Sequence, residues 1–130
     1  MNKNKKTFCF DLDNVICNTS KNYYSKSKPI KKTIDIINKL YDKGFVVKIY
    51  TARYMGRSND KIDQAILKGY DFTKKQLKRW KVKYHFLIFG KPSFDVIIDD
   101  KAFCYQKNWH QSFKKKYLWK LEYFFELYID

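Results

Sequence analysis

The sequence lacks the features that are typical of disulfide-rich secreted proteins, of zinc proteins and of membrane-spanning proteins. Its three cysteines, Cys9, Cys17 and Cys104, are an odd number without CxxC spacing, which argues against a disulfide framework and a zinc site. It has no run of about 20 apolar residues and no early apolar segment followed by a cleavage site. We therefore expect a soluble cytoplasmic protein with no membrane span, in which Cys9 is a small buried hydrophobic residue.

Acidic residues are also scarce, with 13 Asp and Glu against 28 Lys and Arg, for a formal net charge of +15. A positive field favours anionic partners such as phosphate esters, nucleic acid and acidic membrane surfaces. The lysines are scattered along the whole chain, however, so a compositional bias explains them equally well. The charge permits an anionic ligand and does not by itself indicate nucleic-acid binding.

What the chain does have is enough apolar material for one core. Its 130 residues are 45% hydrophobic and 19% aromatic, which predicts a single domain over residues 1–130. Apolar runs predict strands that alternate with amphipathic helices. The expected strands cover residues 7–12, 45–50, 85–89 and 95–98, and the expected helices cover residues 31–43, 62–69 and 74–81, the last capped by Thr73. This alternation predicts an α/β fold, a Rossmann-like three-layer α/β/α sandwich with a mostly parallel sheet.

A wide apolar stripe marks the end of the chain. Aromatic and leucine residues recur at helical spacing over residues 111–128 and predict a C-terminal helix. Packing on the core of the same chain is the first interpretation of this helix. A contact with a partner subunit, and hence a homo-oligomer, is the alternative.

Polar residues gather where the predicted strands end. Carboxylates at positions i and i+2 of a strand point to the same side, and their crowding is tolerated best when a cation lies between them. Mg²⁺ is the simplest such cation because it prefers oxygen ligands, although a solvated acidic turn would explain one pair alone. In parallel α/β sheets, ligands bind beyond the carboxyl ends of the strands. The residues concerned are Asp11 and Asp13, Thr51, Lys91, and Asp99 and Asp100.

Four segments of this set, FDLDNV, YTAR, GKP and IIDD in this order, resemble the four motifs of the haloacid dehalogenase-like (HAD) phosphohydrolase superfamily. The resemblance covers roughly residues 7–105, and Asp11, Asp13 and Val15 match the first motif. The amino-acid sequences of these motifs are most similar to those of small phosphatases linked to capsule and surface-polysaccharide biosynthesis. The resemblance implies a HAD-like fold and an aspartyl-phosphate mechanism.

Roles for individual residues follow from the resemblance. Asp11 would be the nucleophile, and Asp13 would protonate the leaving oxygen and later activate water. Thr51 would hydrogen-bond a phosphoryl oxygen, and Lys91 would neutralise charge between nucleophile and phosphate. Mg²⁺ would be held by Asp11, by the main-chain carbonyl of Asp13 and by Asp99, with Asp100 in a supporting role through water.

The intervals between the motifs are filled by the expected scaffold helices, so the resemblance implies a protein without a cap domain. Substrate selection would then fall to the loops 14–29 and 54–60, together with Asn14, Ala52 and Arg53. Arg53 would grip a second anionic or hydroxyl group, or else form a structural salt bridge. Asn14 stands where many relatives carry glycine, and asparagine also tolerates tight backbone geometry.

These observations predict a Mg²⁺-dependent phosphomonoesterase that acts on a small phosphorylated metabolite such as a sugar or polyol phosphate. The positive charge leaves open a nucleic-acid end-processing phosphatase that removes a 3′-phosphate. A catalytically silent HAD-like binding domain and phosphotransfer to an acceptor other than water are further alternatives.

Overall fold

The computed structural model describes residues 6–118, and the chain divides into two compact units, Met1–Asp95 and Val96–Asp130. The first unit contains the sheet, its helices and a long loop after the first strand. The second contains an irregular segment and a short helix. The predicted single domain over residues 1–130 stays a prediction.

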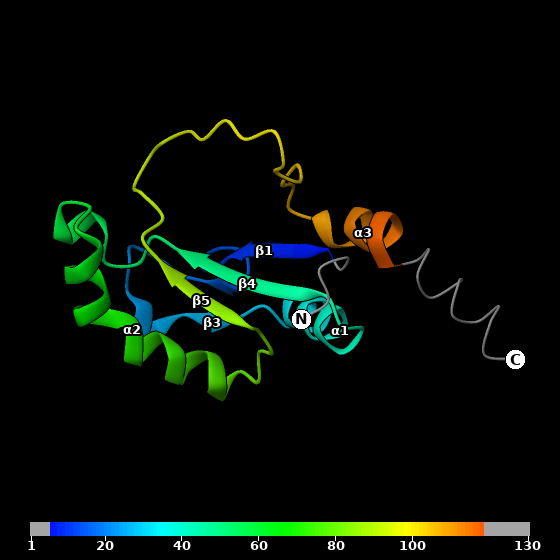
Figure 1. Ribbon diagram of the computed structural model, residues 1–130, viewed down its shortest axis with the longest axis horizontal. Helices are drawn as coiled ribbons and strands as arrows, with labels where there is room; N and C mark the ends of the chain where they lie inside the picture. Colours follow the sequence, from blue (N-terminus) through cyan, green and yellow to red (C-terminus); the bar gives the residue numbers. More distant parts are fainter. Residues whose placement is uncertain (1–5, 119–130) are drawn as a thin grey trace, which may run out of the picture. The chain divides into compact units, whose positions relative to one another are not determined.

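The first unit is built on a parallel sheet of three strands in the order β1-β4-β5 (Figure 1). The strands are β1 (Thr7–Asp11), β4 (Val46–Thr51) and β5 (Phe86–Phe89). In the sheet register Asp11 lies opposite Tyr50, which lies opposite Ile88. The carboxyl ends of all three strands therefore meet at one edge, as predicted for an α/β fold with a mostly parallel sheet.

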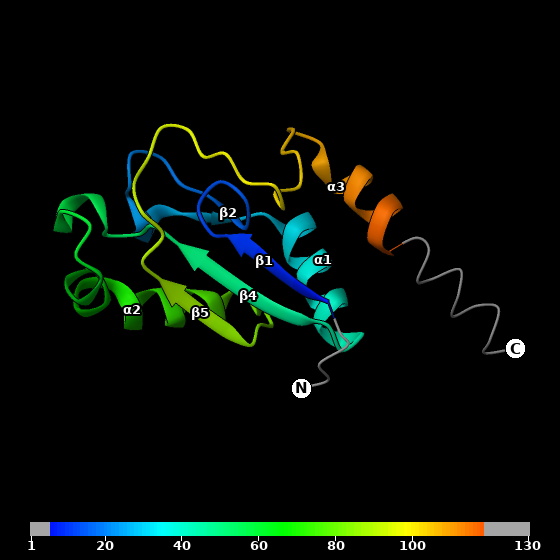
Figure 2. The same ribbon diagram turned by 45° about the horizontal axis from the view of Figure 1, so that its top comes forward.

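Two helices connect these strands and cover one face of the sheet (Figure 2). They are α1 (Lys31–Asp42) and α2 (Ile62–Arg79). Asn38 of α1 joins the two crossovers, because its amide donates to the carbonyl of Lys81 (3.0 Å) and accepts from the N–H of Lys83 (2.8 Å). Helix α1 is thereby tied to the connection between α2 and β5.

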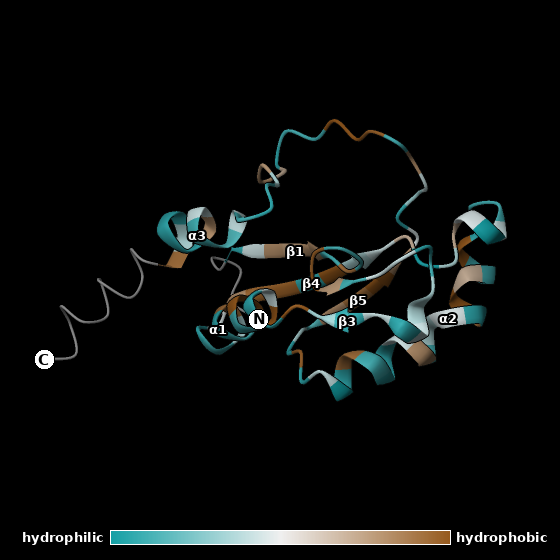
Figure 3. Cartoon of the chain, turned by 180° about the vertical axis from the view of Figure 1, so that it is seen from behind, coloured by the Kyte–Doolittle hydropathy of each residue, from teal (hydrophilic) through white to brown (hydrophobic). Residues whose placement is uncertain are grey.

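Burial along the strands agrees with a sheet that one helical layer covers. In β5, Leu87 and Phe89 are buried, whereas Phe86 and Ile88 are 41% and 37% exposed. Figure 3 shows the apolar colouring concentrated on β4 and β5. Cys9 lies on the open face and is exposed, so the expectation of a buried Cys9 is wrong. The second helical layer of the predicted sandwich stays a prediction.

The helix α2 runs unbroken through two positions that the sequence assigned to its ends. Gly69 was expected to stop a first helix and Thr73 to cap a second, and both lie inside α2. A Cβ at Gly69 would clash with the ring of Tyr54, so glycine is needed here for close approach and not for termination. Thr73 is fully buried and serves as a hydrogen-bond acceptor rather than a cap.

The loop 14–29 contains short elements that fold it back on the end of β1. β2 (Cys17–Asn18) and β3 (Lys28–Pro29) form an antiparallel ribbon, and a 3₁₀ turn covers Tyr24–Lys26. Asn14 has a φ of 68°, in the left-handed region that asparagine tolerates better than most residues. The loop is thereby fixed beside the acidic end of β1.

In the second unit, the segment that was predicted as a fourth strand is irregular. Residues 95–98 form no strand, and no described strand pairs with them. Val96, Ile97 and Ile98 are 78%, 55% and 98% exposed. β-branched residues suit a strand but do not make one without a neighbouring strand to complete the backbone hydrogen bonds. The prediction of a strand at 95–98 is therefore wrong for this structure.

The same unit contains α3 (Trp109–Phe113), which continues as a π-helical turn over Lys114–Leu118. Phe103 packs edge-on against Phe113, with ring centroids 5.6 Å apart. The predicted helix 111–128 thus begins slightly earlier, and its part beyond residue 118 lies outside the described residues. No helix within residues 6–118 is both long and apolar enough to cross a membrane.

Candidate active site

A cavity of about 490 Å³ opens beyond the carboxyl ends of the strands, and all its lining residues belong to the first unit. It is lined by Asp11 at the end of β1 and by residues of the loops that follow β1, β4 and β5. This is where ligands bind in parallel α/β sheets. The lining comprises Asp11, Asp13, Asn14, Asn22, Tyr24, Ala52, Arg53, Tyr54, Gly56, Arg57, Lys91, Pro92, Ser93 and Phe94.

Asp11 is the last residue of β1 and forms an ion pair in the cavity. Its Oδ2 lies 3.3 Å from Nζ of Lys91, and its Oδ1 accepts the N–H of Leu12 at 2.9 Å. The Asp11 side chain is 38% exposed, so a ligand can reach it. Burial raises the pKa of Asp11 above its ordinary value, and the positive charge of Lys91 opposes this shift. The cavity therefore holds an accessible, partly desolvated carboxylate beside a cation.

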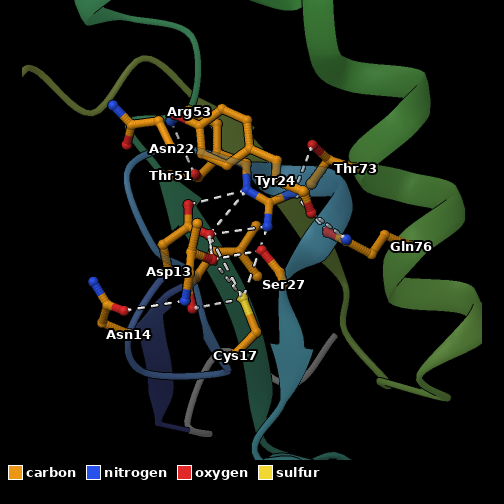
Figure 4. Close-up of polar contacts among 12 residues, drawn as sticks. Asp13, Asn14, Cys17, Asn22, Tyr24, Ser27, Thr51, Arg53, Thr73 and Gln76 are labelled. Atoms are coloured by element: carbon orange, nitrogen blue, oxygen red, sulfur yellow. Dashed lines mark hydrogen bonds and ion pairs between the residues drawn. The ribbon is translucent and has the colours of Figure 1, made fainter.

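Asp13 is engaged on both carboxylate oxygens by Arg53, which follows β4 (Figure 4). The Arg53 Nε donates to Oδ2 at 3.0 Å, and Nη2 donates to Oδ1 at 2.9 Å. The hydroxyl of Thr19 donates to Oδ1 at 2.6 Å, and the thiol of Cys17 lies 3.6 Å from the same atom. These hydrogen bonds from Arg53, Thr19 and Cys17 fix the orientation of the carboxyl group.

The other side of Arg53 is held by α2. Its Nη1 donates to Thr73 Oγ1 at 3.3 Å and to Gln76 Oε1 at 2.7 Å, and its guanidinium lies 4.6 Å from the ring centre of Tyr24. Arg53 is only 1% exposed. We call Asp13, Arg53, Thr73 and Gln76 the Arg53 network. These contacts favour the salt-bridge alternative for Arg53 over a grip on a second substrate group.

Thr51 lies beneath the cavity rather than in its wall. It is fully buried, and its Oγ1 accepts the N–H of Arg53 at 3.1 Å. The hydroxyl thus fixes the turn after β4, and its predicted contact with a phosphoryl oxygen stays a prediction. The predicted residues that do line the cavity together are Asp11, Asp13, Asn14, Ala52, Arg53 and Lys91.

The sequence reasoning missed the partners that hold Asp13 and Arg53. Thr73 and Gln76 are buried polar residues on the inner face of α2, one turn apart and next to buried Leu77. Buried polar side chains need hydrogen-bond partners. Thr73 and Gln76 interrupt the apolar face of α2 in the sequence. Such polar residues at buried positions could have indicated a buried charged partner.

The metal ligands predicted after residue 95 belong to the second unit. Asp99 and Asp100 are exposed there, and Asp99 Oδ1 accepts the N–H of Lys101 at 2.8 Å. Across residues 6–118, no three His, Cys, Asp or Glu side chains group as a metal site would require. Within the cavity, the carboxylate oxygens of Asp11 suit a hard cation. Both carboxylate oxygens of Asp13, in contrast, accept hydrogen bonds from Arg53. The predicted binding of Mg²⁺ in this cavity stays a prediction.

No family model and no curated protein matches the chain. Among solved structures, the crystal structure of an MCSG target from Vibrio cholerae is similar to it, with a TM-score of 0.69 and 25% sequence identity. The match covers 85% of this chain and 98% of the other. The likeness supports the α/β fold and carries no information on activity.

Proposed function

We propose that the protein is a Mg²⁺-dependent phosphomonoesterase that hydrolyses a small phosphorylated metabolite, such as a sugar or polyol phosphate, through an aspartyl-phosphate. The motifs' resemblance to HAD phosphatases of capsule and surface-polysaccharide biosynthesis suggests the pathway. The observation that carries the proposal is the accessible Asp11 carboxylate, paired with Lys91 at 3.3 Å in a cavity at the carboxyl ends of the strands.

Asp11 and Lys91 have complementary roles in the first step. The Asp11 carboxylate attacks phosphorus, the bond between phosphorus and the leaving oxygen breaks as Asp13 gives that oxygen a proton, and the phosphoryl group becomes bonded to Asp11. An anionic nucleophile and an anionic phosphate repel each other, and the Lys91 ammonium beside Asp11 offsets that repulsion. The N–H of Leu12 orients the attacking carboxylate.

Asp13 would transfer the proton in both steps. In the first step it gives a proton to the leaving oxygen, and in the second it takes a proton from the water that hydrolyses the aspartyl-phosphate. Arg53 and Thr19 orient its carboxyl group through hydrogen bonds to the two oxygens. We therefore assign Asp13 the role of general acid and base.

Mg²⁺, when bound, would withdraw charge from the phosphoryl oxygens. Asp11 and the main-chain carbonyl of Asp13 are the ligands that we propose in the cavity. Asp99 and Asp100 remain proposed ligands on the basis of the sequence motif alone.

Phosphate release from a panel of sugar and polyol phosphates, with Mg²⁺ and with excess EDTA, tests this function. We expect Mg²⁺-dependent release by the wild type and none by Asp11→Asn. The matched control is Asp35→Asn, which removes an exposed carboxylate of α1 outside the cavity. An oligonucleotide with a 3′-phosphate belongs in the panel, because turnover of that substrate alone would favour the end-processing alternative. Equal inertness of wild type and Asp11→Asn on every substrate would contradict the proposal.

A further inference from the structure

Arg57 stands out among the charged residues of the cavity because its charge is not matched. The cavity is lined by two carboxylates, Asp11 and Asp13, and by three cations. Lys91 pairs with Asp11, and Arg53 pairs with Asp13. Within residues 6–118 no carboxylate pairs with Arg57, whose Nη2 donates only to the backbone carbonyl of Asn22 at 3.3 Å.

The Arg57 guanidinium is nevertheless held in place. It lies 4.7 Å from the ring centre of Tyr54 and 5.3 Å from that of Tyr24. Its own backbone carbonyl accepts from Nζ of Lys68 at 3.4 Å, which ties the loop to α2. Stacking on aromatic faces orients a guanidinium while leaving most of its N–H groups for hydrogen bonding. Arg57 is exposed, so these donors are accessible.

The aromatic support is itself fixed. Tyr54 has a φ of 66°, which is unfavourable for a bulky residue, and its ring packs where Gly69 provides space. Tyr24 is 8% exposed, and its carbonyl accepts from Nε2 of Gln76 at 2.7 Å. Tyr54 and Tyr24 therefore hold the Arg57 guanidinium in a fixed position. A side chain that is already ordered loses less conformational entropy when it binds a ligand.

We propose that Arg57 is a specificity-determining residue that binds a second anionic group of the substrate, away from the phosphate that reacts at Asp11. The substrate is then a phosphomonoester that also carries a carboxylate or another phosphate. A planar guanidinium suits both groups, because each presents two oxygens to its parallel N–H donors. The volume of 490 Å³ falls in the range of about 300–1,000 Å³ that is usual for small-molecule sites. This inference rests on the proposed phosphatase function and reassigns to Arg57 the second-anion role considered for Arg53.

Paired substrates that differ only in the second anion test the inference. 3-Phosphoglycerate and glycerol 3-phosphate differ in a carboxylate, and fructose 1,6-bisphosphate and fructose 6-phosphate differ in a phosphate. We expect the wild type to have the higher kcat/KM for the two-anion member of at least one pair. Arg57→Gln should reduce that preference by about 10- to 100-fold, mainly through KM, because it removes charge-assisted hydrogen bonds.

Two further variants control this measurement. Arg57→Lys keeps the charge but loses the planar donors, so it should retain part of the preference. Arg79→Gln removes an exposed arginine at the end of α2, outside the cavity, and should leave the preference unchanged. An equal preference in the wild type and Arg57→Gln would overturn the inference, as would a wild-type preference for the one-anion member of both pairs.

Calorimetric binding separates this inference from the proposed function. The same four compounds are titrated, with Mg²⁺ present, into Asp11→Asn and into Asp11→Asn combined with Arg57→Gln. A two-anion affinity that falls about 10-fold or more with Arg57→Gln supports the inference even if the wild type releases no phosphate. Failure of both two-anion compounds to bind overturns it. Turnover of one-anion substrates without any dependence on Arg57 leaves the phosphatase proposal standing and the inference refuted.

Discussion

Residues 8–13 and 95–100 have similar sequences and different structures. In each, two carboxylates follow a short apolar run, Asp11 and Asp13 in the first and Asp99 and Asp100 in the second. The first is a strand and turn in which Phe10 and Leu12 are buried, at 6% and 0% exposed. The second is irregular, and Ile98 is 98% exposed. A local sequence pattern of the same kind has thus led to two outcomes.

Pairing accounts for the difference. β1 pairs with β4 along all five of its residues, and that pairing places Asp11 at the edge where the strands end. Residues 95–98 pair with no described strand, so their backbone gains no ladder of hydrogen bonds. An apolar run therefore indicates that a strand is possible, and a neighbouring strand decides whether it forms.

The largest expected effect compares the two acidic stretches directly. Asp11→Asn should lower phosphate release by at least about 10³-fold, because it removes the nucleophile. Asp99→Asn should lower it by about 100-fold and weaken Mg²⁺ binding if the second stretch supplies a metal ligand, as we propose. Steady-state rates over a Mg²⁺ titration measure both variants. Normal turnover and normal Mg²⁺ dependence in Asp99→Asn would show that only the first stretch acts in catalysis.

Arg53→Ala tests how firmly the first stretch is fixed. It leaves the Asp13 carboxylate and the buried Gln76 without their partner, so we expect the free energy of unfolding to fall by about 3 kcal/mol. Urea denaturation followed by circular dichroism measures the loss. Arg79→Ala, at an exposed position, should change stability by less than about 0.5 kcal/mol. Similar values for the two variants would mean that the Arg53 network contributes little.

A pair of isoleucine truncations compares burial in the two regions. Ile49 of β4 is fully buried, so Ile49→Ala should cost about 2–4 kcal/mol through lost burial and a cavity. Ile98→Ala should cost less than about 0.5 kcal/mol, because the side chain is almost fully exposed. The same denaturation assay applies. A comparable cost for Ile98→Ala would show that residues 95–98 are buried in solution.

Gly69→Ala gives the smallest effect and probes the cavity wall. The added Cβ would meet the ring of Tyr54, which must move, so we expect a loss of about 1–2 kcal/mol. Without that contact, alanine inside a helix would stabilise the protein by up to about 1 kcal/mol. The sign of the change in unfolding free energy therefore decides whether Tyr54 packs against α2.

The sequence predicted the parts of the fold that depend on local pattern. Amphipathic spacing located α1, and apolar runs located β1, β4 and β5 to within a residue or two. The pattern failed where distant contacts decide. From the sequence, Gly69 is predicted to end a helix. In the structure, it lies within α2 and makes room for the ring of Tyr54. Likewise, Val96 and its neighbours are typical of a strand until pairing is considered.

The candidate site shows the same division. The order of the motifs predicted that Asp11, Asp13, Thr51, Lys91, Asp99 and Asp100 would come together at the strand ends. Of these, Asp11, Asp13 and Lys91 line the cavity, whereas Thr51 is fully buried. Which carboxylate pairs with which cation was not predictable, because the pairing depends on side-chain directions set by α2 and by the loop 14–29. The unmatched charge of Arg57 becomes visible only after those pairs are known.

The Arg53 network also has a consequence for folding kinetics. Arg53 bonds to Asp13, 40 residues before it, and to Gln76, 23 residues after it. Such contacts close only after β1, β4 and α2 have assembled, so they are expected to form after the folding transition state. Interactions that form late act mainly on the unfolding rate. Arg53 would therefore slow the unfolding of the first unit. Its loss would raise the unfolding rate more than it lowers the folding rate.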